Sequence, residues 1–266
     1  MKMLSLLLLS FLTMNLIFAQ SDDYQIANHV INGQENYPND ISKIIFSKTK
    51  DFPDNTQLSI AIIQKGKTNY YGIIKLNDTI RPIENQNKVF EIGSITKVFT
   101  STVLASLVEE GKIKLTDEIN PFYSFSFKDN IKLNFKDLAN HTSGLPRLPE
   151  NFDLTNQIDP YKNYGKIQLD EYLTNILKLE NEPAKIYSYS NLGAGVLGYT
   201  LGLTQKTSFE KLLQEKVFDK YNMRSSFISR QNLNEKLVKG QNMNGEVTSN
   251  WSWDVLSGAG GILSTT

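Results

Sequence analysis

The sequence predicts an α+β fold in which a helical lobe is inserted into a lobe that holds an antiparallel sheet. A β-rich hairpin occupies residues 57–75, and a long apolar helix starts near residue 94. The chain after that helix is mostly helical or loop-like, with few convincing strands. A two-stranded hairpin is not stable by itself, so the sheet needs strands from elsewhere in the chain.

Composition excludes several classes of partner and site. The chain has 266 residues, enough for one large domain or two lobes. Its 28 basic and 28 acidic residues cancel, so nothing indicates a nucleic acid or an anionic surface as partner. Because the chain has no cysteine, disulfides, a cysteine nucleophile, thiolate zinc sites and a lipidated cysteine anchor are excluded.

Residues 1–19 are typical of a secretory signal peptide. Lys2 gives a positive start, an uncharged and mostly apolar run follows, and Ala19 is a small residue at which cleavage can occur. The alternative is a retained membrane anchor, but the run is short and interrupted by Asn15. We therefore expect a secreted or periplasmic protein without stable membrane insertion, with a segment 20–56 ahead of the main domain.

The expected elements follow in chain order. Residues 57–64 and 68–75 are strands joined by a turn that contains Gly66, and residues 77–88 are irregular. Further helices are expected at 134–140, 168–179, 192–203 and, from a capping box at Thr207 and Glu210, 207–221. Three glycines within the 192–203 helix indicate close packing against another element: Gly193, Gly195 and Gly198.

The helix that begins near Ser94 carries the main candidate site. Lys97 lies three residues after Ser94, so the two side chains share one helix face. An amine there can take the hydroxyl proton and leave a nucleophilic alkoxide, while the helix N-terminus offers N–H groups for an oxyanion. The alternative is a solvated first turn with Ser94 as an ordinary N-cap.

Spacing alone does not identify this pair, because S-x-x-K also occurs at Ser47–Lys50 and Ser208–Lys211. The surroundings distinguish the middle pair. Apolar residues recur at helical spacing from residue 95 to 108 and predict a largely buried helix, which Gly111 ends. A lysine on the first turn of a buried helix is unusual, because burying an unpaired ammonium is costly.

Motifs for other chemistries are absent from the sequence. It contains no H-E-x-x-H, no G-x-S-x-G and no G-x-x-x-x-G-K-[ST], which argues against a zincin, an α/β-hydrolase and a nucleotide phosphate site. The histidines are His29 and His141. His141 precedes Thr-Ser-Gly and is expected to be a turn residue bonded to backbone rather than a triad member.

Tyr189 and Asn191 form a second candidate group just before the glycine-containing helix. In an extended segment, residues two apart point the same way, so this phenol and amide face one site. The phenol can relay a proton, and the amide can hold a substrate carbonyl. The alternative is a strand-end tyrosine followed by an asparagine N-cap.

Together these segments resemble the serine hydrolases related to class C β-lactamases and penicillin-binding D-Ala-D-Ala carboxypeptidases. The resemblance runs in family order from about residue 57 to the end of the sequence. It is carried by SIAIIQKGK (59–67), FEIGSITK (90–97), LVEEGKIKLTDEI (107–119), LANHTSGLP (138–146), YSYSNLG (187–193) and GAGGILST (258–265).

The resemblance implies roles, lobes and substrates. Ser94 is the implied acylated nucleophile, with Lys97 as its base, Tyr189 as proton shuttle to the leaving group and Asn191 as the substrate-amide ligand. The Ser94 N–H is one implied arm of the oxyanion hole. A lobe of residues 57–118 and 255–266 would hold the sheet, with a helical lobe at 119–254. The implied substrates are β-lactams, D-Ala or peptidoglycan-like peptides, or esters, with no cofactor or metal.

One departure from the family pattern concerns the third motif, a Lys or His followed by Thr or Ser and Gly. In the family it lies on a strand after the G-A-G-G segment, and here no such motif follows before Thr266. We therefore expect the last sheet strands to be missing from this sequence. The alternative function is a catalytically weakened fragment or ligand-binding pseudoenzyme, since losing one oxyanion donor costs roughly 100- to 1000-fold in rate.

Overall fold

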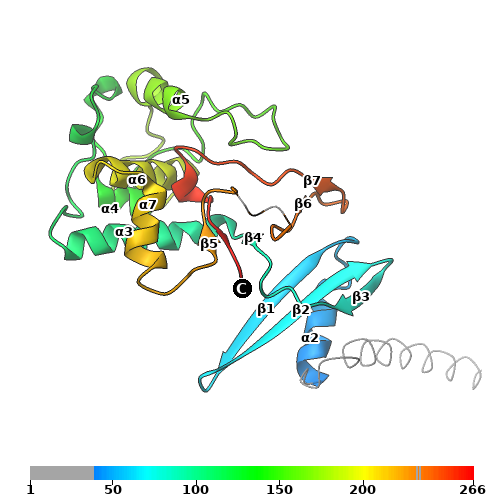
Figure 1. Cartoon of the computed structure of the whole chain (residues 1–266). Helices are drawn as coiled ribbons and strands as arrows, with labels where there is room; N and C mark the ends of the chain where they lie inside the picture. Colours follow the sequence, from blue (N-terminus) through cyan, green and yellow to red (C-terminus); the bar gives the residue numbers. More distant parts are fainter. Residues whose placement is uncertain (1–38, 232, 234) are drawn as a thin grey trace, which may run out of the picture. The chain divides into compact units, whose positions relative to one another are not determined.

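The computed structural model describes residues 39–231, 233 and 235–266 (Figure 1). The predicted signal peptide and the first part of the segment 20–56 lie outside the described residues. The described residues divide into two compact units, one that includes residues 39–88, 241–247 and 266 and one that includes residues 89–240 and 248–265. Each unit is described by itself. The lobe boundaries expected from the sequence remain a prediction.

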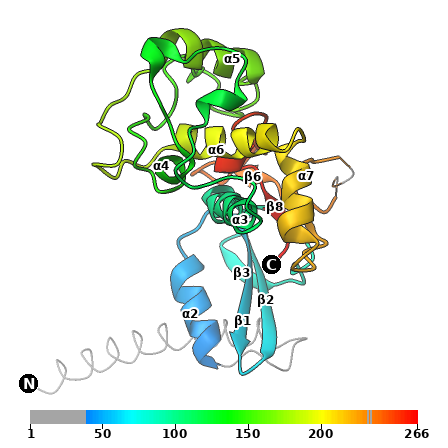
Figure 2. The same ribbon diagram turned by 90° about the vertical axis from the view of Figure 1, so that its left-hand side faces the viewer.

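The first unit pairs a helix with an antiparallel sheet, seen from two sides in Figures 1 and 2. The sheet has the order β1-β2-β3, and Ile45 of the helix packs with Tyr71 and Ile73 of the central strand. The predicted hairpin is confirmed, with Gln64 opposite Lys67. The elements are α2 (Asn39–Thr49), β1 (Gln57–Gln64), β2 (Lys67–Leu76) and β3 (Thr79–Pro82).

Strand β3 corrects the expectation that residues 77–88 are irregular. Asn77 and Asp78 both have positive φ, at 51° and 55°, as the two central residues of a tight hairpin turn require. The chain therefore reverses at this Asn-Asp pair and adds a third strand. Asparagine and aspartate tolerate this conformation better than most residues. The Asn-Asp pair is therefore a local signal for a turn between two strands.

The second unit is mainly helical and includes a small antiparallel sheet of order β4-β8-β5. Its core gathers side chains from α3, α4, α6 and α7. Helices and sheets together confirm the α+β fold class. The elements are β4 (Phe90–Glu91), η1 (Gly93–Ile95), α3 (Thr96–Glu109), η2 (Asn120–Phe122), η3 (Lys128–Asn130), α4 (Phe135–Ala139), α5 (Lys166–Glu171), η4 (Tyr172–Ile176), α6 (Asn191–Thr204), α7 (Phe209–Leu213), η5 (Gln214–Phe218), β5 (Ser226–Phe227), η6 (Ser257–Ala259) and β8 (Leu263–Ser264). The short strands β6 (Gly240–Gln241) and β7 (Val247–Thr248) pair with each other.

Helix α3 is buried along one face, from Thr96 to Leu107. Val103, Leu104 and Leu107 are at most 2% exposed, whereas Ile95 and Val98 are 60% and 66% exposed. The prediction of a largely buried helix is therefore wrong for the opposite face, where Ala105 and Glu109 are exposed as well. Gly111 ends the helix as predicted: its φ is +68°, and its N–H donates to Val108 O at 3.0 Å.

Helix α6 lies beside α3 and packs closely on η6 (Figure 1). A Cβ on Gly195 would lie 2.8 Å from Leu256 Cα, and one on Gly198 would lie 3.0 Å from Gly258 Cα. Both glycines thus allow the close packing that the sequence predicts. For Gly193 the nearest atom is instead Ser190 Oγ at 3.3 Å, within the cap of the same helix.

Helices α5 and α7 are shorter than predicted, because each continues into a single wide turn, η4 and η5. The N-cap of α7 is Ser208, whose side chain accepts from Lys211 N, and not Thr207. Glu210 correspondingly does not close a capping box and accepts from Ser229 N at 2.8 Å. Across residues 39–231, 233 and 235–266, no helix is both long and apolar enough to cross a membrane.

Candidate active site

Ser94 lies in the one-turn segment η1, between strand β4 and helix α3. Ile92 N donates to Ile262 O at 3.1 Å, which ties the approach to the segment before β8. Gly93 then adopts a φ of +52°, a left-handed conformation that favours glycine. Thr100 Oγ1 donates to Gly258 O at 2.8 Å. The segment 258–262 therefore contacts the chain both before Ser94, at Ile92, and after it, at Thr100.

Two side chains contact the Ser94 hydroxyl. Lys97 Nζ donates to Ser94 Oγ at 3.1 Å, and Tyr189 OH donates to the same oxygen at 2.7 Å. Ser94 itself is exposed, and Lys97 and Tyr189 are half-buried. Ser94 is not an ordinary N-cap, because α3 has no side-chain cap and begins at Thr96. The hydroxyl is thus free to react while two proton-transfer groups contact it.

Lys97 is fixed from a second direction by a backbone carbonyl. Its Nζ donates to Ala259 O at 2.6 Å, which holds the side chain over Ser94. Burial lowers the pKa of Lys97, the hydrogen bond and charge of Tyr189 oppose this, and the charge of Arg147 lowers it further. The net pKa lies below that of a free lysine, so more of the neutral amine is present at a given pH.

Tyr189 lies in a cationic surrounding. Lys97 Nζ and Arg147 Cζ lie 4.8 Å and 5.1 Å from the centre of its ring. Burial by itself raises the pKa of Tyr189, but hydrogen bonds with Lys97 and Ser94 and the charges of Lys97 and Arg147 outweigh burial, so the net pKa is lowered. A phenol with a lowered pKa releases its proton more readily to a neighbouring group.

The ring of His141 packs beside the ring of Tyr189. No hydrogen bond of the described residues joins His141 to Ser94. Its ring lies 4.7 Å from the Tyr189 ring, and its Nδ1 accepts from Ser190 N at 3.2 Å. The φ of His141 is +58°, and its carbonyl accepts from Ser188 N. The expectation of a turn residue bonded to backbone is confirmed. Burial, and then the charge of Lys97, lower the pKa of His141, which favours the neutral ring that can accept at Nδ1.

Asn191 begins helix α6 after the N-cap Ser190. Its Nδ2 donates to Tyr161 OH at 3.0 Å, while its Oδ1 is buried without a hydrogen-bond partner among the described residues. An unpartnered buried amide oxygen is costly, so this oxygen is poised to accept from a group that enters the site. The expected substrate contact of Asn191 therefore includes an acceptor as well as a donor.

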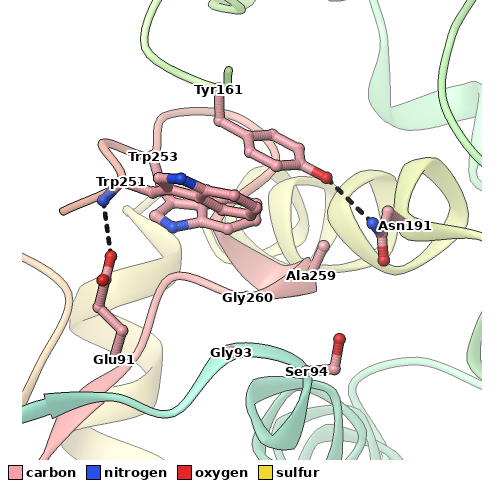
Figure 3. Close-up of a pocket in the computed structure, with 9 residues that line it drawn as sticks. All are labelled: Glu91, Gly93, Ser94, Tyr161, Asn191, Trp251, Trp253, Ala259 and Gly260. Carbon is pink, nitrogen blue, oxygen red and sulfur yellow. Dashed lines mark hydrogen bonds between the residues drawn. The ribbon is translucent and has the colours of Figure 1, made fainter. Parts of the chain in front are cut away.

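A cavity of about 260 Å³ opens beside Ser94 (Figure 3). Ser94 and Asn191 border it on one side, and the rings of Tyr161, Trp251 and Trp253 form another side. The lining is completed by Glu91, Gly93, Ala259 and Gly260.

The structure brings Ser94, Lys97 and Tyr189 into contact, and Asn191 lies on the cavity that Ser94 borders. Lys97 and Tyr189 are not among the residues that line this cavity, and the catalytic roles of all four residues remain predictions. The aromatic residues that line the cavity are not among the site residues predicted from the sequence. Trp251 and Trp253 are two apart, a spacing that places both on one side of an extended segment. This spacing is the local signal in the sequence that indicates a pair of rings on one face. Tyr161 gave no usable local signal. Within the described part of the chain, no group of three or more His, Asp or Glu side chains is placed to hold a metal ion.

Comparison with known proteins gives a consistent set of relatives. The family model described as Beta-lactamase matches residues 49–266. A beta-lactamase of Pseudomonas fluorescens is 31% identical over 181 residues, which are 66% of this chain and 47% of that protein. Beta-lactamase-like protein 4 of Dictyostelium discoideum is 28% identical over 257 residues, covering 85% of this chain and 43% of that protein. The chain thus matches less than half the length of these relatives.

Solved structures share the fold. A class C beta-lactamase from Rhodobacter sphaeroides aligns with a TM-score of 0.64 at 21% identity, covering 84% of this chain and 60% of that one. A beta-lactamase/D-alanine carboxypeptidase from Pseudomonas syringae aligns with a TM-score of 0.66 at 21% identity, covering 91% of this chain and 62% of that one. At such identities the likeness extends to the fold alone.

Proposed function

Since the chain belongs to the beta-lactamase family, we propose that it is a serine hydrolase that forms an acyl-enzyme on Ser94. The observation that carries the proposal is the double contact on one hydroxyl. Lys97 Nζ and Tyr189 OH both lie within hydrogen-bond distance of Ser94 Oγ. A nucleophile needs a base within hydrogen-bond distance, and two different side chains lie at that distance from the Ser94 hydroxyl.

In the acylation step, Ser94 Oγ attacks the substrate carbonyl carbon, and its proton passes to the neutral amine of Lys97. The lowered pKa of Lys97 supports this assignment, because a neutral amine is required to accept the proton. Tyr189 then delivers a proton to the leaving group as the carbonyl–leaving-group bond breaks. The proton lost from the phenol is restored from Lys97, so no net charge accumulates.

In the deacylation step, water attacks the acyl–Ser94 carbonyl, and the released carboxylic acid leaves Ser94 with its proton restored. The N–H of Ser94 stabilises the oxyanion in both steps, and Asn191 holds a polar group of the substrate. These groups act on any carbonyl with a leaving group. We therefore propose β-lactams, D-Ala peptides and esters as the substrate classes to test.

We further propose that the protein acts outside the cytoplasm, as the composition of residues 1–19 suggests. N-terminal sequencing of protein recovered from the expressing cells tests this directly. A mature N-terminus near residue 20 supports export, and retention of Met1 in an otherwise cytoplasmic protein contradicts it.

Hydrolysis assays with paired variants test the proposed function. We expect the purified protein to hydrolyse at least one chromogenic cephalosporin, D-Ala peptide or p-nitrophenyl ester, and Ser94→Ala to abolish that activity. Ser208→Ala is the matched control, because it alters another S-x-x-K serine. Activity that survives Ser94→Ala at the original rate removes Ser94 from the mechanism. Binding of these compounds without turnover favours the alternative of a ligand-binding pseudoenzyme.

A further inference from the structure

Asp159 is a buried carboxylate that lies outside the group of side chains at Ser94. It is 6% exposed, and both its oxygens bind one residue: Oδ1 accepts from Ser252 N at 2.7 Å, and Oδ2 accepts from Ser252 Oγ at 2.6 Å. A carboxylate can be buried without a large cost only when its oxygens are hydrogen-bonded in this way. The two bonds fix both the backbone and the side chain of Ser252.

Arg230 completes the cluster around Ser252. Its Nη2 donates to Ser252 Oγ and lies 4.0 Å from Asp159 Oδ2. Its Nη1 donates to Asn250 O at 2.9 Å. The Ser252 hydroxyl therefore accepts from a cation and donates to an anion, so both of its bonds are charge-assisted. The backbone of Asp159 is itself fixed, because Asn156 Oδ1 accepts from Asp159 N and Asn156 Nδ2 donates to Asp159 O.

Ser252 lies between Trp251 and Trp253, which both line the cavity. Glu91 accepts from Trp251 N at 2.6 Å, as Figure 3 shows. Two consecutive backbone N–H groups are thus each held by a carboxylate. Because the held residue stands between the two tryptophans in the chain, a displacement of Ser252 would displace both indole rings.

The segments that carry Asp159 and Ser252 meet a second time at Tyr161. The rings of Tyr161 and Trp253 are stacked, with centroids 3.9 Å apart and planes at 22°. The Tyr161 hydroxyl accepts from Asn191 Nδ2 at 3.0 Å, the second bond drawn in Figure 3. A continuous path of contacts therefore leads from the buried carboxylate to the Asn191 amide.

The cluster has no direct link to the reacting groups. Among the described residues, no hydrogen bond or ion pair joins Asp159 or Arg230 to Ser94 or to the two side chains that contact its hydroxyl. Asn191, at the far end of the path, does border the cavity. A change in the cluster should therefore alter how the cavity holds a polar group and not proton transfer at Ser94.

Resting on the proposed acyl transfer to Ser94, we propose that Asp159 is a positioning residue for the Asn191 amide. Its hold on Ser252 keeps Trp253 against Tyr161, and the Tyr161 hydroxyl keeps the amide oriented at the edge of the cavity. Asp159 thus sets the affinity for substrates that offer an amide group to the site, without taking part in bond making or breaking.

Three esters test the proposal: phenyl acetate, which has no amide; the phenyl ester of N-acetylglycine, with an amide on the acyl part; and 4-acetamidophenyl acetate, with an amide on the leaving group. We expect Asp159→Ala to lower kcat/KM for at least one amide-bearing ester roughly tenfold or more, mainly through KM, because misplaced binding groups are costly. For phenyl acetate we expect a change of less than about twofold, since the reacting groups stay in place.

Control variants separate this role from a general loss of structure. Asp153 is exposed and also accepts twice from one residue, Thr155, so Asp153→Ala is the matched control and is expected to leave all three rates unchanged. Asp159→Asn keeps an acceptor for Ser252 N and is expected to retain more of the amide-ester rate than Asp159→Ala. If Asp159→Ala does not fold, Ser252→Ala removes the bond to Oδ2 alone, with an expected loss of roughly threefold.

The tryptophans give a second readout, because the two tryptophans of the chain flank Ser252. In Asp159→Ala we expect stronger quenching of their fluorescence by acrylamide and a weaker near-UV circular dichroism signal, with the far-UV signal unchanged. Unchanged tryptophan signals overturn the proposal. Equal losses of rate for all three esters overturn it as well, since the carboxylate would then only stabilise the fold.

A binding measurement distinguishes failure of this proposal from failure of the proposed hydrolysis. Hydrolysis in which Asp159→Ala spares the amide-bearing esters keeps the hydrolase and refutes the positioning role. If neither these esters nor the substrates proposed above are hydrolysed, acyl transfer is refuted, and fluorescence titration of the Ser94→Ala variant with N-acetylglycinamide decides the positioning role. Binding that weakens about fivefold or more when Asp159→Ala is added supports the role, and equal binding or none overturns it.

Discussion

The turn that leads into α3 and the turn that leads into α7 carry the same S-x-x-K spacing and have opposite surroundings. Ser208 Oγ accepts from the backbone N of Lys211 at 3.1 Å, and the Lys211 side chain is 64% exposed and lies 3.7 Å from Glu215. Ser94 Oγ instead receives the Lys97 side chain and the Tyr189 hydroxyl. Ser208 therefore stabilises its helix, whereas Ser94 is left available for chemistry.

Distant contacts produce this difference. Lys97 is held by Ala259 O and Ser94 by Tyr189 OH, partners 162 and 95 residues away along the chain. The partners of Ser208 and Lys211 all lie within four residues. The pair at Ser47 is local as well, since Ser47 Oγ donates to Ile44 O. A short motif thus indicates a site only where the tertiary structure brings other reactive groups to it.

The largest expected difference between the two turns concerns the lysines. Lys97→Met is expected to lower the rate of Ser94 acylation by roughly 10³- to 10⁴-fold, because it removes the base. Lys211→Met is the matched control and is expected to change that rate less than twofold. Stopped-flow acylation measurements on both variants provide the comparison, and equal rates for the two variants would contradict it.

Removal of the Tyr189 hydroxyl is expected to have the next largest effect. Tyr189→Phe keeps the ring beside His141 and Lys97 but loses the 2.7 Å bond to Ser94, so we expect turnover to fall by roughly 100-fold with folding intact. Circular dichroism and steady-state kinetics measure the two properties separately. An unchanged rate in a folded variant removes Tyr189 from the mechanism.

The rate of Ser94 acylation should depend on the protonation state of Lys97 and therefore on pH. Because Lys97 must be neutral to act as a base, we expect acylation to fall about tenfold for each pH unit below its lowered pKa. The sign for stability follows from the same shift. Between the folded-state pKa and the higher unfolded value, the unfolded chain binds more protons, so stability rises with pH in that window. A pH-rate profile that is flat through the acid range argues against Lys97 as the base.

The smallest expected effect concerns stability, and here Ser208 matters more than Ser94. Ser208→Ala removes an N-cap bond and is expected to lower the free energy of unfolding by about 1 kcal/mol. Ser94→Ala is expected to change it by less than about 0.5 kcal/mol, because Ser94 caps no helix. Urea denaturation of the two variants measures this difference. A larger loss for Ser94→Ala would assign Ser94 a structural role.

Local signals in the sequence predicted much of this structure. The turn at Gly66 predicted the hairpin, and Asn134 caps α4 by accepting from Asp137 N as its spacing indicates. The Ser94–Lys97 pair follows from one turn of helix, and Tyr189 was found through its place before the glycine-containing helix. In each case the deciding residues lie within a few positions of one another, so their physical interaction can be inferred from spacing.

Features that depend on long-range packing were not predicted. The aromatic side of the cavity beside Ser94 depends on contacts between distant residues. Tyr161 stacks on Trp253, 92 positions away in the sequence, and Asp159 binds Ser252. Exposure of Ile95 and Val98 likewise depends on which elements cover α3, which helical periodicity does not specify. Strand β3 was missed for a local reason, because the Asn77–Asp78 turn was overlooked.

The most direct test of Ser94 as the nucleophile is to map the residue that a fluorophosphonate or a fluorescent penicillin modifies. The intact protein is exposed to each reagent, digested and analysed by tandem mass spectrometry across the peptides that contain Ser47, Ser94 and Ser208. We expect an adduct on Ser94 alone, because that hydroxyl alone among the three contacts both a lysine side chain and a phenol in the described structure. An adduct on Ser208 or Ser47, or none on Ser94 in a protein that is folded by circular dichroism, would contradict it.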